Sequence, residues 1–357
     1  APPAAPNWCA TPSSTAWLIN DPGWLPAAFN QGHVYRDRIR EPVASTIAFY
    51  AERYPHSAVE VWEERLAAGE IVLNGQRLRA DGPLAQGDRL AWHRPPWQET
   101  AVPVLPERAI VFDDGDLLVL NKPSGLPVLP AGGFLQHTLL AQLEGWLVAG
   151  VIAAGSGASS VAVTAPLATG CPRPVHRLGR FTSGLLVCAR SPASRAWLSA
   201  LLRDGSGSER CHKLYRALTQ PLPADWAIGE TRQLTTPIGL GPHPRLGWIW
   251  CAASAEDPAA LSSRSALTLL ERRQGSCLVA VAIATGRPHQ IRIHTAALGA
   301  PLLGDPLYRA GGDAHPAALP GDGGYHLHAH QLGLTGPDGR RLELEAPLPP
   351  SLEVRTG

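Results

Sequence analysis

The 357-residue sequence contains no methionine, and only two of its 31 basic residues are lysine, Lys122 and Lys213. Together with 36 glycines and 35 prolines, this skew is typical of a GC-rich coding sequence. Because no initiating methionine is present, we expect the chain to be a processed product or a fragment. Targeting therefore cannot be read from its first residues.

The sequence also lacks any run of about 18 apolar residues, so we expect no transmembrane helix and no membrane partner. Its six cysteines form no CxxC pair, which favours reduced thiols in an intracellular protein and argues against a zinc site. Net charge is only +1, so any surface that attracts a polyanion must be local. With 45% hydrophobic residues, the chain can bury a sizeable core.

The hydrophobic pattern predicts four segments. Residues 1–45 form an N-terminal extension, and 46–97 a small unit with helical spacing over 45–68 and a hairpin turn at Asn74-Gly75. Pro-rich residues 98–108 indicate a linker, and 109–357 form a larger unit. That unit has a predicted helix over 139–147 and Gly-rich insertions at 149–171, 204–209 and 310–324. Its predicted strands are 117–120, 184–189, 214–218, 277–283, 291–294 and 326–332. Helices and strands mix without a regular βαβ period, which favours an α+β fold.

Positive charge is concentrated in residues 173–216, which contain nine Lys or Arg and two acids. Such a region suits a phosphate backbone, although a solvated charged face explains it equally well. Within it, His176, Arg177 and Arg180 precede the turn 182–184, which leads into an apolar strand. We expect these three side chains to face a ligand at the end of a sheet.

A second polar cluster occupies residues 285–294. If 290–294 is extended, Gln290, Arg292 and His294 share one face, which would need anions or partners. Metal binding is the alternative, and the alternating histidines at 326, 328 and 330 invite the same idea. No Cys, Asp or Glu cluster accompanies them, so polar strand faces near a ligand are the favoured interpretation.

Five motifs occur here in the order typical of one family. They are LLVLNKPSGLPV (117–128), HRLGRFTSG (176–184), KLYRAL (213–218), TGRPHQIRIH (285–294) and LLGDPLY (302–308). Together they resemble the RluA-type pseudouridine synthases over residues 108–350. Residues 65–97 are similar to the small RNA-binding domain that these enzymes often carry. With GGYHLHAHQL (323–332), the whole most resembles a plant and algal subgroup.

The resemblance implies a pseudouridine synthase fold: a curved, mixed, mostly antiparallel sheet with flanking helices and a central cleft, preceded by the small RNA-binding-like domain. It implies an isomerase that flips a uridine out of RNA, cleaves its glycosidic bond and rejoins the uracil through C5. No cofactor and no metal are implied. The partner would be transfer, ribosomal or organellar RNA, and we expect a monomer whose cellular compartment the sequence does not identify.

The resemblance also assigns roles to individual residues. Tyr215 matches a tyrosine that stacks on the target base and helps move a proton. Arg292 matches an arginine that pairs with a catalytic aspartate, and Arg177 matches one that helps flip the base. The remaining predicted RNA-contacting residues are His176, Arg180, Thr182, Lys122, Lys213, Arg287, His289, Gln290 and His294.

The aspartate position is occupied by Gly179, which offers neither a nucleophile nor a charge. Loss of such a group normally costs several orders of magnitude in rate. Arg292 would then lack its expected anion, and Asp305 is expected to have only a structural role in its turn. Two hypotheses follow: an active synthase with another carboxylate or an altered route, or a catalytically impaired RNA-binding or assembly protein.

Overall fold

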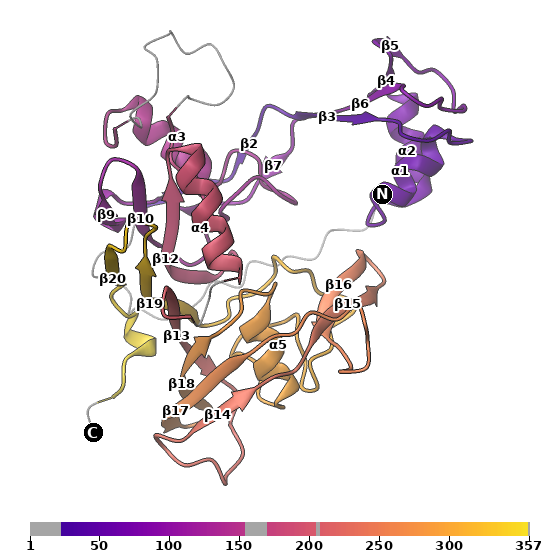
Figure 1. Cartoon of the computed structure of the whole chain (residues 1–357). Coiled ribbons are helices and arrows are strands. Elements are labelled where there is room, and N and C mark those ends of the chain that lie inside the picture. Colours follow the sequence, from indigo (N-terminus) through magenta and orange to yellow (C-terminus); the bar gives the residue numbers. More distant parts are fainter. Residues whose placement is uncertain (1–22, 154–169, 205–207, 356–357) are drawn as a thin grey trace.

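The computed structural model describes residues 23–153, 170–204 and 208–355, with a small N-terminal domain joined to a larger one (Figure 1). The first 22 residues of the predicted extension, most of the predicted insertion at 149–171 and half of the one at 204–209 lie outside the described residues. Within the described ranges, every helix is too short or too polar to cross a membrane.

The N-terminal domain packs two helices on a four-stranded sheet ordered β3-β6-β4-β5. The predicted turn is confirmed, since Asn74 and Gly75 have φ of 49° and 87° between β4 and β5. Its core includes Tyr50, Trp62 and Trp92, whose rings pack together. The elements are β3 (His33–Arg38), α1 (Thr46–Arg53), α2 (Val59–Ala67), β4 (Ile71–Leu73), β5 (Gln76–Arg77) and β6 (Arg89–Arg94).

The connection between the domains differs from the predicted extension and linker. β3, inside the predicted extension, pairs with β6 of the N-terminal sheet. β1 (Trp24–Leu25) pairs with β8 (Val102–Pro103), and β2 (Ala28–Phe29) pairs with β7 (Gln98–Glu99). The two segments that connect the domains, residues 24–29 and 98–103, thus pair with each other. Val102 and Leu105 are buried in the core of the larger domain. Proline content does not reveal such pairing between distant strands, so the sequence did not indicate β3 within 1–45 or the strand pairs formed by residues 98–103.

The larger domain is built on a ten-stranded sheet with the main order β14-β17-β18-β13-β19-β12-β10-β9. All its pairs are antiparallel except β12 with β19, so the α+β, mostly antiparallel prediction is confirmed. β11 extends the sheet beside β12, and β20 beside β19. Figure 1 shows α3 and α4 on the side of β12 and α5 near β15 and β16.

The bounds of these elements are as follows. The sheet strands are β9 (Ile110–Asp113), β10 (Leu117–Lys122), β11 (Arg173–Pro174), β12 (Thr182–Ala189), β13 (Cys211–Thr219), β14 (Thr231–Leu234), β17 (Ser265–Arg273), β18 (Ser276–Ile283), β19 (Leu327–Thr335) and β20 (Arg341–Glu345). The other elements are α3 (Leu139–Val148), α4 (Pro192–Asp204), α5 (Gln290–Ala297), the hairpin β15 (Ile238–His243) and β16 (Gly247–Ala252), and short 3-10 turns at Glu107–Ala109 and Pro350–Leu352.

The strand predicted at 291–294 was wrong, because these residues lie in the helix α5, which begins at Gln290. His289 precedes it with φ of 53°, a left-handed conformation that turns the chain out of the extended path. On a helix, Gln290 and His294 share a face, whereas Arg292 points elsewhere. Both Gln290 and His294 contact the hydroxyl of Ser265, at 2.9 Å each. The shared polar face predicted for all three residues does not exist.

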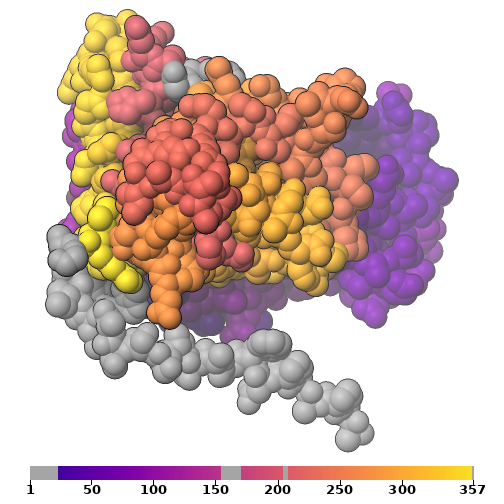
Figure 2. Space-filling view, turned by 90° about the horizontal axis from the view of Figure 1, so that it is seen from below, coloured from indigo at the N-terminus to yellow at the C-terminus, as the bar shows by residue number. Residues whose placement is uncertain are grey.

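The two domains also meet through the β15–β16 hairpin. A β-carbon added to Gly247 at the hairpin turn would lie 3.2 Å from Pro55, which is in the loop between α1 and α2. Figure 2 shows the indigo N-terminal domain against orange segments of the larger domain at one end of the molecule. The N-terminal domain is thus held both by the paired strands and by this hairpin.

Candidate active site

Tyr215 lies in the middle of the large sheet. One row of paired residues crosses five strands: Lys122 opposite Gly184, Gly184 opposite Ala329, Ala329 opposite Tyr215, and Tyr215 opposite Val281. Residues paired across neighbouring strands project to the same face, so Tyr215 and Lys122 share one face of the sheet. Burial strongly raises the pKa of the Tyr215 phenol, which is therefore neutral near pH 7.

The loop before β12 brings Gly179 to this face. The amide of Thr182 donates to the Gly179 carbonyl at 3.0 Å and closes a turn. The Arg180 carbonyl accepts from the Gly125 amide at 2.9 Å and from the Lys122 ammonium at 3.0 Å. The loop is therefore fixed to residues 122–125, which follow β10.

Lys122 and Lys213 lie in the protein interior, although both were predicted to contact RNA. Lys122 Nζ donates to the carbonyls of Pro123, Leu126 and Arg180, and burial, with a smaller effect of Arg180, lowers its pKa to about 7. Lys213 Nζ donates to the Leu202 carbonyl at 2.8 Å, and burial lowers its pKa to about 8. The geometry gives both lysines structural partners, and neither ammonium faces outward.

The three basic residues of the motif 176–180 differ in their surroundings. His176 and Arg180 have partners within the protein, whereas Arg177 is exposed. His176 accepts the Val187 amide through Nε2 at 2.9 Å, and burial lowers its pKa to about 3, so the ring is neutral. Arg180 donates to the Gly125 carbonyl at 3.0 Å and stacks 4.6 Å from the centre of the Phe134 ring. Arg177 is exposed, which leaves it the best placed of the three to meet a phosphate.

Arg292 has an anionic partner, contrary to the expectation from Gly179. Its Nε and Nη2 donate to the two carboxylate oxygens of Asp305 at 2.6 and 2.7 Å. The side chains are 3% and 0% exposed. Burial opposes the charge of Arg292, but the bonds to Asp305 outweigh it and raise the pKa of Arg292. The amides of Leu307 and Tyr308 also donate to Asp305, at 2.9 and 3.4 Å, so the expected turn role holds as well.

Two tyrosines enclose the Arg292 guanidinium. It lies 4.3 Å from the Tyr325 ring centre and 5.1 Å from that of Tyr308. The Tyr308 hydroxyl donates to the Trp250 carbonyl at 2.7 Å, so it accepts from His289 Nδ1 at 2.6 Å. Burial and the nearby cations Arg292 and Arg177 lower the pKa of His289 to about 3, with Asp305 opposing them. His289 is therefore a neutral, positioned ring beside the arginine.

Tyr325 joins this cluster to Gly179. Its hydroxyl lies where a side chain at residue 179 would be, so a β-carbon there would overlap it. The same hydroxyl is 3.3 Å from Thr182 Oγ1, at the start of β12. Arg292, Tyr325, Thr182 and Gly179 thus form one continuous group at the end of two central strands.

Asp305 and Tyr325 were not among the predicted site residues. Both lie inside quoted motifs, LLGDPLY and GGYHLHAHQL, and this was the only available signal. The meeting of Gly179, Tyr215 and Arg292 in one cleft stays a prediction, and the contacts described above connect Arg292 to Gly179 through Tyr325. Arg287 donates to the Ser262 carbonyl at 3.0 Å and remains partly exposed.

Two of the histidines that suggested a metal, His328 and His330, have other partners. His328 Nδ1 lies 2.8 Å from Ser183 Oγ, and His330 Nδ1 lies 2.9 Å from the Ala346 carbonyl. In the described ranges, no group of three His, Cys, Asp or Glu residues is placed to hold a metal ion.

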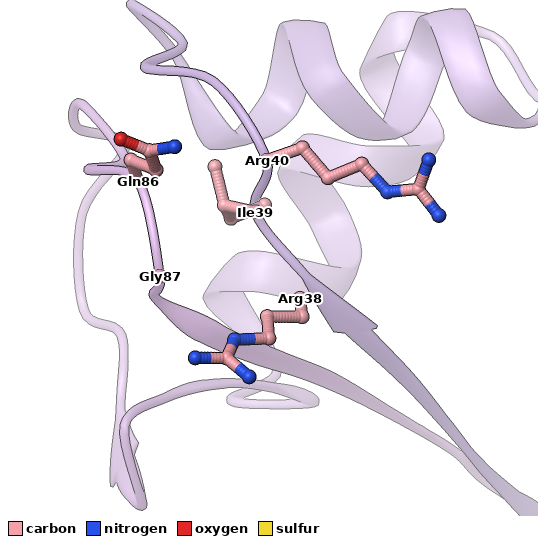
Figure 3. A pocket seen from close by; sticks show the side chains of 5 residues that line it. All are labelled: Arg38, Ile39, Arg40, Gln86 and Gly87. Carbon is pink, nitrogen blue, oxygen red and sulfur yellow. The ribbon is translucent and has the colours of Figure 1, made fainter.

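A hollow of about 600 Å³ lies elsewhere, in the N-terminal domain. It is lined by Arg38, Ile39, Arg40, Gln86 and Gly87 (Figure 3). The Arg40 side chain points away from Gln86 and Gly87 in this view. The hollow is formed by the loops at one end of β3 and β6 and does not include any predicted catalytic residue.

Comparison with known proteins identifies relatives over most of the chain. A family model described as RNA pseudouridylate synthase matches residues 116–297, which include Gly179, Tyr215 and Arg292. An uncharacterised RNA pseudouridine synthase of Synechocystis is 39% identical over 86% of this chain and 96% of its own length. RNA pseudouridine synthase 5 of Arabidopsis thaliana is 36% identical over 91% of this chain and 95% of its own. Among solved structures, human RNA pseudouridylate synthase domain containing 4 matches 69% of this chain and 90% of its own, with 22% identity and a TM-score of 0.48.

Proposed function

This chain belongs to the RNA pseudouridine synthase family, and we propose that it isomerises uridine to pseudouridine within a structured RNA. The reaction breaks the bond between ribose C1′ and uracil N1 and forms a bond between C1′ and C5. No atoms are gained or lost, so the reaction needs no co-substrate. The target base must leave its stack to reach the protein.

The observation that carries the proposal is that Gly179 and Arg292 are connected through Tyr325 and that both, like Tyr215, lie inside the segment that matches the family. Tyr215 offers a neutral ring in the middle of the sheet, suited to contact a flipped uracil. Exposed Arg177 lies two residues from Gly179, where it can hold a phosphate or take the place of the flipped base. We propose RNA as the only macromolecular substrate, acted on by a monomer.

The alternative, an impaired RNA-binding or assembly protein, rested on Gly179 and on the missing partner of Arg292. The second reason no longer applies, since Asp305 holds Arg292 in place. The relatives that cover nearly the whole chain are named as synthases, which supports the catalytic function.

The test is direct mapping of the product. The purified chain is incubated with transfer and ribosomal RNA transcripts, and pseudouridine is located by chemical tagging. We expect product at defined uridines, and we expect Tyr215→Phe to reduce the rate at least about 100-fold while RNA affinity is retained. Tyr50→Phe is the matched control, because Tyr50 is a buried tyrosine in the N-terminal core. A folded wild-type chain that binds these RNAs and yields no pseudouridine would favour the binding-protein hypothesis.

A further inference from the structure

None of the three carboxylates Asp113, Asp116 and Asp305 can replace the side chain that Gly179 lacks. Both oxygens of Asp305 already accept bonds from Arg292 and from two backbone amides, and its side chain is fully buried. Asp113 is held by both terminal nitrogens of Arg190 at 2.8 Å. Asp116 accepts from Ser191 and Ser194.

Distance excludes Asp113 and Asp116 as well. They flank the turn before β10, whereas the Gly179 loop is anchored at the opposite end of that strand, at Lys122. Five steps of extended chain separate Leu117 from Lys122, which is roughly 17 Å. These carboxylates therefore hold the β9–β10 turn and α4 in place and do not approach Gly179.

The oxygen that does lie beside Gly179 belongs to Tyr325. Its separation from an ideal β-carbon at residue 179 is close to the roughly 2.4 Å that standard bond lengths give between an aspartate β-carbon and its own carboxylate oxygen. The Tyr325 hydroxyl oxygen thus lies at about the same distance from this β-carbon position as the carboxylate oxygen of an aspartate at residue 179 would. Tyr325 is only 2% exposed, whereas Gly179, which lies beside its hydroxyl, is partly exposed.

The surroundings of Tyr325 suit a phenol that must carry negative charge for part of a reaction. The Arg292 guanidinium lies 4.3 Å from the centre of its ring, and Asp305 fixes the guanidinium in that place. A cation above an aromatic face attracts the ring more strongly as electron density on the ring increases, as it does in a phenolate. Among the residues that the structure describes, the hydroxyl has one hydrogen-bond partner, Thr182 Oγ1 at 3.3 Å, which is a weak contact that a substrate atom can replace.

We propose that the Tyr325 hydroxyl is the catalytic oxygen of this enzyme and does the work of the carboxylate that residue 179 does not supply. The inference rests on the proposed function. The phenol oxygen bonds to C1′ as the C1′–N1 bond breaks, and the phenolic proton passes to N1. After the uracil turns, C5 bonds to C1′ and the C1′–oxygen bond breaks, returning its electron pair to Tyr325. The hydrogen on C5 leaves as a proton and restores the phenol, so the product carries hydrogen on N1 and the enzyme is regenerated.

Three variants of the full chain test this, each assayed for single-turnover pseudouridine formation on an RNA that the wild type modifies. Tyr325→Phe removes only the oxygen. Gly179→Asp adds a carboxylate that collides with the hydroxyl. The double variant Gly179→Asp/Tyr325→Phe transfers the oxygen from one residue to the other, because the ring carbon that remains would be 3.6 Å from the new β-carbon, an ordinary contact. RNA affinity and melting temperature are measured for each, with Tyr50→Phe as control.

We expect Tyr325→Phe to react at least about 100-fold more slowly with unchanged RNA affinity, and Gly179→Asp to lose thermal stability. The double variant should melt at a higher temperature than Gly179→Asp and react at least about 10-fold faster than Tyr325→Phe. A Tyr325→Phe rate near that of the wild type would overturn the proposal, as would a folded, RNA-binding double variant no faster than Tyr325→Phe. Neither result affects the proposed function, which fails only if the wild type forms no pseudouridine.

Discussion

The two sides of the Gly179 loop are held by different kinds of contact. On one side, Lys122 and Arg180 donate to main-chain carbonyls, and we call this the scaffold side. On the other, Arg292, Asp305 and Tyr325 contact one another through their side chains, and we call this the reaction side. Bonds to carbonyls fix the path of the chain, whereas paired side chains fix charges and a hydroxyl relative to Gly179.

This difference shows why charge alone was a poor guide to the site. The scaffold side holds cations that the sequence suggested for RNA, yet their protons are directed to the protein itself. The reaction side holds a neutralised ion pair with no net charge to attract a polyanion, and it lies next to the glycine where chemistry is expected. Substitutions on the two sides should therefore fail in different ways.

The largest effect is expected on the reaction side, from Asp305→Ala. This change leaves the Arg292 charge buried without a partner, which costs about 3 to 5 kcal/mol of unfolding free energy. Chemical denaturation of the variant measures the loss. The double variant Arg292→Met/Asp305→Ala should be more stable than Asp305→Ala, because it removes the unpaired charge. If the double variant is the less stable of the two, the ion pair is not what organises this side.

The next effect is expected on the scaffold side, from Lys122→Met. Three carbonyls lose their donor, so the variant should lose about 2 to 3 kcal/mol near neutral pH. The loss should depend on pH. The folded pKa of about 7 lies below the ordinary lysine value, so between about pH 7 and 10 the unfolded chain binds more protons than the folded one.

The stability of the wild type relative to Lys122→Met should therefore rise with pH across this window, by at most about 1.4 kcal/mol per pH unit. As the pH falls through 7, this contribution is lost. Denaturation of both proteins at pH 7, 8 and 9 measures the difference. A difference that stays constant with pH would mean that the buried amine keeps its ordinary pKa.

The smallest effects are expected from substitutions of two arginines in the same loop, Arg177 and Arg180. Arg177→Ala should leave stability unchanged and lower RNA affinity, with the slope of log affinity against log salt reduced by roughly one. Arg180→Ala should lower the unfolding free energy by about 1 kcal/mol, because it loses the Gly125 carbonyl and the Phe134 ring. Binding titrations over a salt series and parallel melts measure both. Equal stability losses in the two variants would remove the distinction between scaffold and exposed cation.

The sequence predicted most of the fold that surrounds the site. The strands around 184–189, 214–218, 277–283 and 326–332 were correct because their apolar runs are long and bounded by turn residues. The helix at 290–297 was missed because the polar residues at 290, 292 and 294 also match a two-residue period. The turn that starts this helix depends on a left-handed His289, which no local pattern indicates.

The site itself was predicted only in part, for a related reason. Gly179, Tyr215 and Arg292 were found through motifs, but their partners come from distant segments. Asp305 is 13 residues beyond Arg292, and Tyr325 follows Gly179 by nearly 150 residues. Contacts of that separation are decided by how strands are ordered in the sheet, which hydrophobic patterning does not specify. From the sequence alone, Gly179 at the aspartate position therefore suggested impaired catalysis, because the Tyr325 hydroxyl beside it comes from a distant segment.

One measurement tests the central claim most directly: the single-turnover rate of pseudouridine formation on one mapped RNA, compared between the wild type and Tyr325→Phe. The reaction side as described predicts clear product with the wild type and a rate at least about 100-fold lower with the variant, at equal RNA binding. Equal rates in the two proteins would contradict it, since the oxygen beside Gly179 would then have no part in the reaction.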